Sequence, residues 1–149
     1  MHCYDFNVVL QEVPGEISLC FSISGCPLRC PGCHSPFLWK NQSGNKITLE
    51  NFKEFLHQYY GFASCILFMG GEWHPHELIP MLKYAQSMGY KTCLYTGQEQ
   101  VEPGILEYLT YIKTGPWIEE LGGLSSKKTN QIFREVSTNK ILNHLFIPK

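Results

Sequence analysis

The stretch CILFMGGE, residues 65–72, decides the fold of this chain. Its first five residues are continuously apolar, which is typical of a strand buried on both faces of a parallel sheet. Two glycines end the strand, and Glu72 places a carboxylate directly after them. A strand buried in this way needs helices against its sheet, so we expect helical segments on both sides of it in the chain.

Helical patterns do flank this strand. Thr48 is a candidate helix N-cap, and apolar residues recur at helical spacing through residues 49–59. After the strand, a second apolar stripe covers residues 78–88 and stops at Gly89, a typical C-terminal signal. Two prolines near the start of this stripe leave its first helical residue open, because proline fits well only in the first turn.

The rest of the chain adds further strands. Residues 6–13 and 17–24 read as a hairpin around the turn at Pro14-Gly15, with apolar residues alternating in its second arm. YKTCLYTG and TYIKTG each predict a strand, with GILEYL as a short helix between them. QIFREV and ILNHLFI, near the end, are additional strand candidates.

Strands that alternate with helices imply right-handed crossovers and a mostly parallel sheet. The glycine-rich strand ends would then share one edge, where α/β proteins place their sites: Gly25, Gly70, Gly71, Gly97 and Gly115. A complete eight-fold barrel needs roughly 200 residues or more, and this chain has 149. We therefore expect a single domain over residues 1–149, with an α/β fold that forms an open, partial (βα) barrel.

The composition excludes several classes of function. A hydrophobic content of 44% and a charged content of 17% describe an ordinary globular protein, and a net charge of -1 gives no reason to expect nucleic acid. No apolar run approaches the roughly 20 residues that a membrane span needs. The first residues lack the pattern of a signal peptide. We expect a cytoplasmic protein with no nucleic-acid or membrane partner.

Seven cysteines are unusual for a cytoplasmic chain, and their odd number argues against a disulfide framework. Cys20, Cys65 and Cys93 lie inside apolar runs, where a free cysteine usually packs as a small hydrophobic residue. Cys3 carries little information. The other three cysteines share the stretch SGCPLRCPGCHSP, residues 24–36, directly after an expected strand.

Three chemistries compete for Cys26, Cys30 and Cys33. Zinc would take the three thiolates and His34 or an outside ligand, but structural zinc sites commonly use two separated ligand pairs. A redox dithiol of Cys30 and Cys33 would leave Cys26 idle. A [4Fe–4S] cluster held by three thiolates would leave one iron open to an external ligand. In that case the absence of a fourth cysteine ligand keeps one coordination position of the cluster free for substrate chemistry.

The C-x3-C-x2-C spacing, together with Met69-Gly70-Gly71-Glu72 at the end of the next long strand, resembles the radical S-adenosylmethionine (SAM) superfamily. The finer pattern CPLRCPGCHSP, with Gly32 before the third cysteine, resembles the activating proteins of anaerobic (class III) ribonucleoside-triphosphate reductases. Radical SAM proteins share a partial or full α/β barrel, in agreement with the fold expected above.

The resemblance implies a [4Fe–4S] cluster and SAM as cofactors. The cysteines at 26, 30 and 33 would hold the cluster, and Glu72 would bind the ammonium group of SAM. The residues expected around the rest of SAM are Gly70 and Gly71 at the methionine moiety, Gly32, Cys33 and His34 at the adenine, and Ser24 and Thr96 as weaker candidates for the ribose or carboxylate. No further catalytic side chain is implied.

The implied activity is the reductive cleavage of SAM to a 5′-deoxyadenosyl radical, which generates a glycyl radical on a large partner, anaerobic ribonucleotide reductase. An external donor such as a flavodoxin-type protein would supply the electron. We expect the open barrel to expose the site laterally, so that a protein loop can enter. The alternatives are an activase of another glycyl-radical enzyme, of the pyruvate formate-lyase type, and, from a different class, a small structural zinc-binding module.

Several conspicuous residues favour a structural interpretation. Trp73, His74 and His76 are expected in a turn and helix start rather than in a metal site. Trp117 and the loop of residues 119–128 are either a partner-docking surface or a plain loop.

Overall fold

The computed structural model describes residues 1–28, 30, 39–40 and 44–148. The strands in this part of the chain are β1 (His2–Val9), β2 (Ser18–Ile23), β3 (Asn45–Lys46), β4 (Cys65–Met69), β5 (Lys91–Tyr95), β6 (Tyr111–Thr114), β7 (Ile132–Glu135) and β8 (Lys140–Ile141). The helices are α1 (Leu49–Gln58), α2 (Pro75–Ser87), α3 (Pro103–Leu106) and a 3-10 helix, η2 (Asn143–Phe146).

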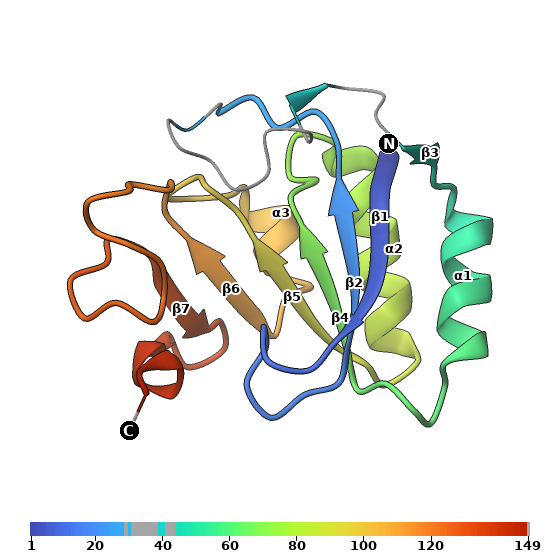
Figure 1. Cartoon of the computed structure of the whole chain (residues 1–149). Coiled ribbons are helices and arrows are strands. Elements are labelled where there is room, and N and C mark those ends of the chain that lie inside the picture. The colour runs from blue at the N-terminus through green and yellow to red at the C-terminus, as the bar shows by residue number, and fades with distance from the viewer. Residues whose placement is uncertain (29, 31–38, 41–43, 149) are drawn as a thin grey trace.

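The described strands form one sheet in the order β3-β1-β2-β4-β5-β6-β7-β8. The central strands β2, β4, β5 and β6 are parallel, and the outer strands pair antiparallel. Among the described residues, each crossover between parallel strands carries one α-helix and moves one strand further in the same direction. The three described α-helices therefore cover the same face of the sheet (Figure 1). The expected α/β fold with a mostly parallel central sheet is confirmed.

Two segments differ from the sequence-based expectation. The first strand spans His2–Val9 rather than residues 6–13, because Val9 pairs with Ser18 and the chain between them forms a long connection. The Tyr95 hydroxyl donates a hydrogen bond to the Glu12 carbonyl and holds this connection against the sheet. Near the end of the chain, residues 143–146 form a 3-10 helix, where a strand was a candidate.

The ends of the helices follow the local signals in the sequence. Thr48 caps α1 in a capping box with Asn51, whose backbone N–H donates to the Thr48 hydroxyl at 3.1 Å. Gly89 ends α2 with a φ of 87°, in the left-handed conformation that glycine adopts most easily. Pro75 takes the first helical position, and α2 continues through Pro80, which is solvent-exposed. In the described part of the chain, no helix is long and apolar enough to cross a membrane.

The face of the sheet that the helices cover carries the larger core. Phe21 and Phe68 from the strands and Phe52 from α1 are fully buried, with ring centroids 5.3 to 5.7 Å apart. Burial of each such ring stabilises the fold by about 1.5–3 kcal/mol. This core fixes the helices against the sheet and leaves the carboxyl edge of the parallel strands uncovered by them (Figure 1).

The opposite face carries a smaller core that contains Cys20, Cys65 and Cys93 beside Leu67 and Phe133. Burial raises the pKa of the Cys20 and Cys65 thiols to about 12, and it raises the pKa of Cys93 as well. These thiols therefore stay protonated at neutral pH. The expectation that the three cysteines pack as hydrophobic residues is confirmed.

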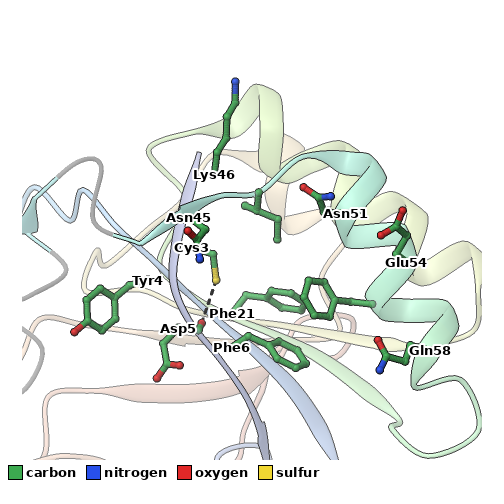
Figure 2. A pocket seen from close by; sticks show the side chains of 12 residues that line it. Cys3, Tyr4, Asp5, Phe6, Phe21, Asn45, Lys46, Asn51, Glu54 and Gln58 are labelled. Carbon is green, nitrogen blue, oxygen red and sulfur yellow. Dashed lines mark hydrogen bonds between the residues drawn. The ribbon is translucent and has the colours of Figure 1, made fainter.

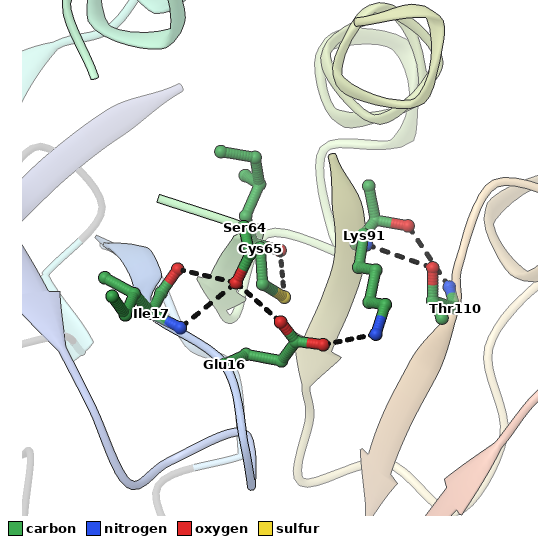
Figure 3. A network of polar contacts seen from close by, with 8 residues as sticks. Glu16, Ile17, Ser64, Cys65, Lys91 and Thr110 are labelled. Atoms are coloured by element: carbon green, nitrogen blue, oxygen red, sulfur yellow. Dashed lines mark hydrogen bonds and ion pairs between the residues drawn. The ribbon is translucent and has the colours of Figure 1, made fainter. Parts of the chain in front are cut away.

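A polar network joins the amino-terminal ends of the parallel strands (Figure 3). Ser64 donates to a Glu16 carboxylate oxygen at 2.5 Å and accepts from the Ile17 N–H at 3.1 Å. The other Glu16 oxygen forms an ion pair with Lys91 at the start of β5. Burial opposes ionisation of Glu16, but the hydrogen bonds from Lys91 and Ser64 outweigh it and hold the pKa of this carboxyl below its ordinary value of 4.5.

We expect Glu16→Gln to lower the free energy of unfolding at pH 7 by about 0.5–1 kcal/mol, a small value because Lys91 is half exposed. A lowered carboxyl pKa stabilises the folded chain above pH 4.5, and this contribution disappears as the pH falls through the folded-state value. Urea unfolding at pH 7 and at pH 3 measures both effects, with the exposed Glu119→Gln as control. Equal stability of Glu16→Gln and wild type at pH 7 would contradict the role of the ion pair.

Candidate functional site

The carboxyl ends of the parallel strands meet at one edge, as the glycine-rich strand ends predicted. The Gly70 N–H donates to the Tyr95 carbonyl at 2.9 Å, and the Thr96 N–H donates to the Lys113 carbonyl at 2.9 Å. These bonds continue the pairing of β4, β5 and β6 past the ends of the strands. The segments that follow the strands are therefore held side by side.

Glu72 is fixed at this edge by Thr96. The Thr96 hydroxyl donates to Glu72 Oε1 at 2.5 Å and itself accepts from the Gln98 N–H at 3.0 Å. Glu72 Oε2 is buried and has no hydrogen-bond partner among the described residues. Burial raises the pKa of Glu72, although the bond from Thr96 acts in the opposite direction. An oriented, desolvated carboxylate oxygen without a partner suits a bound ammonium group.

The two glycines before Glu72 form a turn that requires glycine, and the predicted approach of their backbone to the methionine moiety of SAM stays a prediction. Gly70 has a φ of 83° and Gly71 a φ of 111°, so neither position accommodates another residue without strain. A Cβ atom at Gly70 would also lie 2.5 Å from Cη2 of Trp73. This turn therefore depends on glycine both for its backbone conformation and for the space that Trp73 occupies.

The predicted cluster ligands lie in the segment that leaves β2. Cys26 and Cys30 are half-buried, and Leu28 between them lies against Gly97, just past the end of β5. The chain between these two cysteines therefore reaches the carboxyl edge at which Glu72 lies. Cys33, Gly32 and His34 lie outside the described residues. Within the described part of the chain, no three His, Cys, Asp or Glu side chains are grouped to hold a metal ion.

The other two predicted SAM contacts are buried. Ser24 is fully buried, and its main chain bonds to His2 through the N–H and to Trp73 through the carbonyl. Thr96 is 2% exposed and contacts Glu72 as described above. Their assignment to the ribose or carboxylate of SAM stays a prediction.

Lys113 is a residue that the sequence analysis missed. Burial lowers its pKa to about 8, even though the charge of Glu72 favours its protonated form. Its ammonium nitrogen lies 5.4 Å from the centroid of the Tyr95 ring. Both side chains line a cavity of about 320 Å³ on the face opposite the α-helices. A lysine in the middle of a short predicted strand, YIKT, was the available signal for a buried cation.

The region after Glu72 forms the expected turn and helix start. His74 is the N-cap residue of α2, and His76 is exposed in its first turn. Trp73 has a larger role than a turn residue, because its indole N–H donates to the Ser24 carbonyl at 3.0 Å. Trp73 therefore connects the end of β2 with the turn that carries Glu72.

A cavity of about 540 Å³ lies elsewhere, between β1, β3 and α1 (Figure 2). The Cys3 thiol donates to the Asp5 carbonyl at 3.0 Å, and burial raises the pKa of Cys3 to about 11. A protonated thiol is a poor metal ligand and a poor nucleophile. This cavity is therefore a weaker candidate for a metal site or a catalytic site than the carboxyl edge, despite its size.

Comparison with known proteins identifies a family and several relatives. Residues 13–121 match the family described as "4Fe-4S single cluster domain". The pyruvate formate-lyase-activating enzyme of Clostridium pasteurianum is 31% identical over 93 residues, which are 58% of this chain and 39% of that enzyme. The 7-carboxy-7-deazaguanine synthase of Hyperthermus butylicus is 29% identical over 84 residues, 55% of this chain and 35% of that enzyme.

The fold has a counterpart among solved structures. The crystal structure of QueE from Escherichia coli superimposes with a TM-score of 0.57 at 16% sequence identity, over 76% of this chain and 70% of that chain. At this identity the similarity concerns the fold alone. This chain spans well under half the length of the two enzymes named above.

Proposed function

This chain belongs to the 4Fe-4S single cluster domain family, of the radical SAM type, and we propose that it activates a glycyl-radical enzyme. The observation that carries the proposal is the Glu72 carboxylate, which Thr96 orients through one oxygen and whose second oxygen is buried without a described partner. It lies at the edge where Leu28, between Cys26 and Cys30, contacts Gly97.

In this proposal Cys26, Cys30 and Cys33 hold the [4Fe–4S] cluster, and Glu72 binds the ammonium group of SAM. When bound, the cluster and SAM supply a 5′-deoxyadenosyl radical after one-electron reduction by an external donor. The chain itself orients the ammonium group through Glu72, and the positive φ values of Gly70 and Gly71 form the turn that presents this carboxylate. No side chain needs to act as a general base.

The proposal also includes the identity of the glycyl-radical enzyme that this chain activates. The sequence CPLRCPGCHSP favours anaerobic ribonucleotide reductase as the enzyme that receives the glycyl radical. The similarity to a pyruvate formate-lyase-activating enzyme favours the other activase type as second candidate. The described sheet is open, since its edge strands β3 and β8 do not pair with each other, and this supports the proposal that a loop of a partner protein enters the site from the side.

The test uses anaerobically purified and reconstituted protein. We expect about four irons per chain, a brown colour, and dithionite-dependent conversion of SAM to 5′-deoxyadenosine. Mixed with anaerobic ribonucleotide reductase, SAM and reductant, the protein should then produce the EPR doublet of a glycyl radical on that enzyme. Pyruvate formate-lyase is the parallel sample, and a doublet there alone would move the assignment to the second candidate. A colourless protein with one zinc ion would exclude both.

A further inference from the structure

Residues 24–28, the segment that directly follows β2, run across the carboxyl ends of the neighbouring strands (Figure 1). Trp73 holds the beginning of this segment, because its indole N–H donates to the Ser24 carbonyl at 3.0 Å. The same ring occupies the space beside Gly70, where a Cβ atom would lie 2.5 Å from it. Because Gly70 has no side chain, the Trp73 ring can pack against it. Trp73 thereby connects the end of β2 with the turn after β4.

Leu28 holds the segment at a second point. A Cβ atom at Gly97 would lie 2.3 Å from Cδ1 of Leu28 and 3.7 Å from Cα of Pro116. Leu28 therefore fills the space that a side chain at position 97 would take, over the ends of β5 and β6. The φ of Gly97 is not positive, so another residue could adopt its backbone conformation. Glycine is needed here only because a side chain would occupy the space of Leu28.

We propose that Leu28 and Trp73 are positioning residues that fix Cys26 and Cys30 over the carboxyl edge of the sheet. The role given to the two thiols rests on the function proposed above. Leu28 lies two residues from each cysteine, so its contact with Gly97 restricts both. Ordering a free backbone costs about 1–2 kcal/mol per residue. If contacts with the sheet already fix the segment, iron binding to its thiols requires less of this loss of backbone entropy.

The direct test is Gly97→Ala in two backgrounds. In the wild-type chain the new methyl group collides with Leu28, and we expect iron to be released to a chelator about five-fold faster from the reconstituted protein. In the Leu28→Ala background the collision partner is gone, so Gly97→Ala should change the rate by less than about 1.5-fold. Leu28→Met, which retains an apolar side chain of similar volume, should release iron at nearly the wild-type rate. An equal effect of Gly97→Ala in both backgrounds, or none in either, overturns the proposal.

A second readout does not need the cluster. In the metal-free chain, the rates at which iodoacetamide alkylates Cys26 and Cys30, followed by mass spectrometry, should rise several-fold in Leu28→Ala and in Trp73→Phe. The half-buried Leu106→Ala is the control, with thermal unfolding of every variant measured alongside. Wild-type protein that takes up no iron would refute the proposed function, whereas unchanged alkylation rates would refute the positioning role alone.

Discussion

We expect Cys30→Ala to bind no more than background iron after anaerobic reconstitution and to lose all SAM cleavage. Three thiolates are the whole protein ligand set in the proposed site, so the removal of one leaves a second iron without a protein ligand. Cys26→Ala and Cys33→Ala should behave in the same way. Iron content per chain, the absorbance near 400 nm and the yield of 5′-deoxyadenosine measure the effect.

The matched control is Cys65→Ala, which removes a thiol from the smaller core. Cys65 is fully buried and its pKa is raised to about 12, so it contributes packing and not a thiolate. We expect a full complement of iron and a loss of about 1–2 kcal/mol in the free energy of unfolding, below the range of larger buried aliphatic residues. Full iron content in Cys30→Ala, or loss of iron in Cys65→Ala, would contradict the ligand assignment.

The parts of the fold that depend on local chemistry could be predicted from the sequence. The cap at Thr48, the glycine end of α2 and the buried strand CILFM each follow from residues that are adjacent in the chain. The register of β1 could not be predicted in this way. It depends on the pairing of Val9 with Ser18 and on the bond from the Tyr95 hydroxyl to a loop 83 residues earlier.

The same distinction holds for the candidate site. Gly70, Gly71 and Glu72 were recognisable because they are consecutive, and the structure adds that Thr96 orients Glu72. The contacts that place the neighbouring segment join positions far apart in the chain. Trp73 meets Ser24, 49 residues earlier, and no local pattern shows that Gly97 lies beneath Leu28. Such contacts become visible only when the order of the strands is known.

Glu72→Gln should weaken SAM binding by about 10- to 100-fold while leaving the iron content unchanged. The substitution preserves the size of the side chain and an oxygen that can accept from Thr96, but it removes the charge that would face the ammonium group. A hydrogen bond to a charged group contributes about 1.5–3 kcal/mol, and 1.4 kcal/mol corresponds to a factor of ten in affinity. Anaerobic equilibrium dialysis with labelled SAM measures the dissociation constant.

The pH dependence of SAM binding distinguishes the charge of Glu72 from its shape. Burial raises the pKa of this carboxyl in the ligand-free protein, so the affinity of wild type should fall as the pH drops through that raised value, by up to tenfold per pH unit below it. Glu72→Gln has no such group and should lose this part of the pH dependence. The control is Glu54→Gln, an exposed residue on α1 that lines the 540 Å³ cavity. It should bind SAM like wild type, and a loss of affinity in this variant instead of Glu72→Gln would place SAM in that cavity and remove the central support for the proposed site.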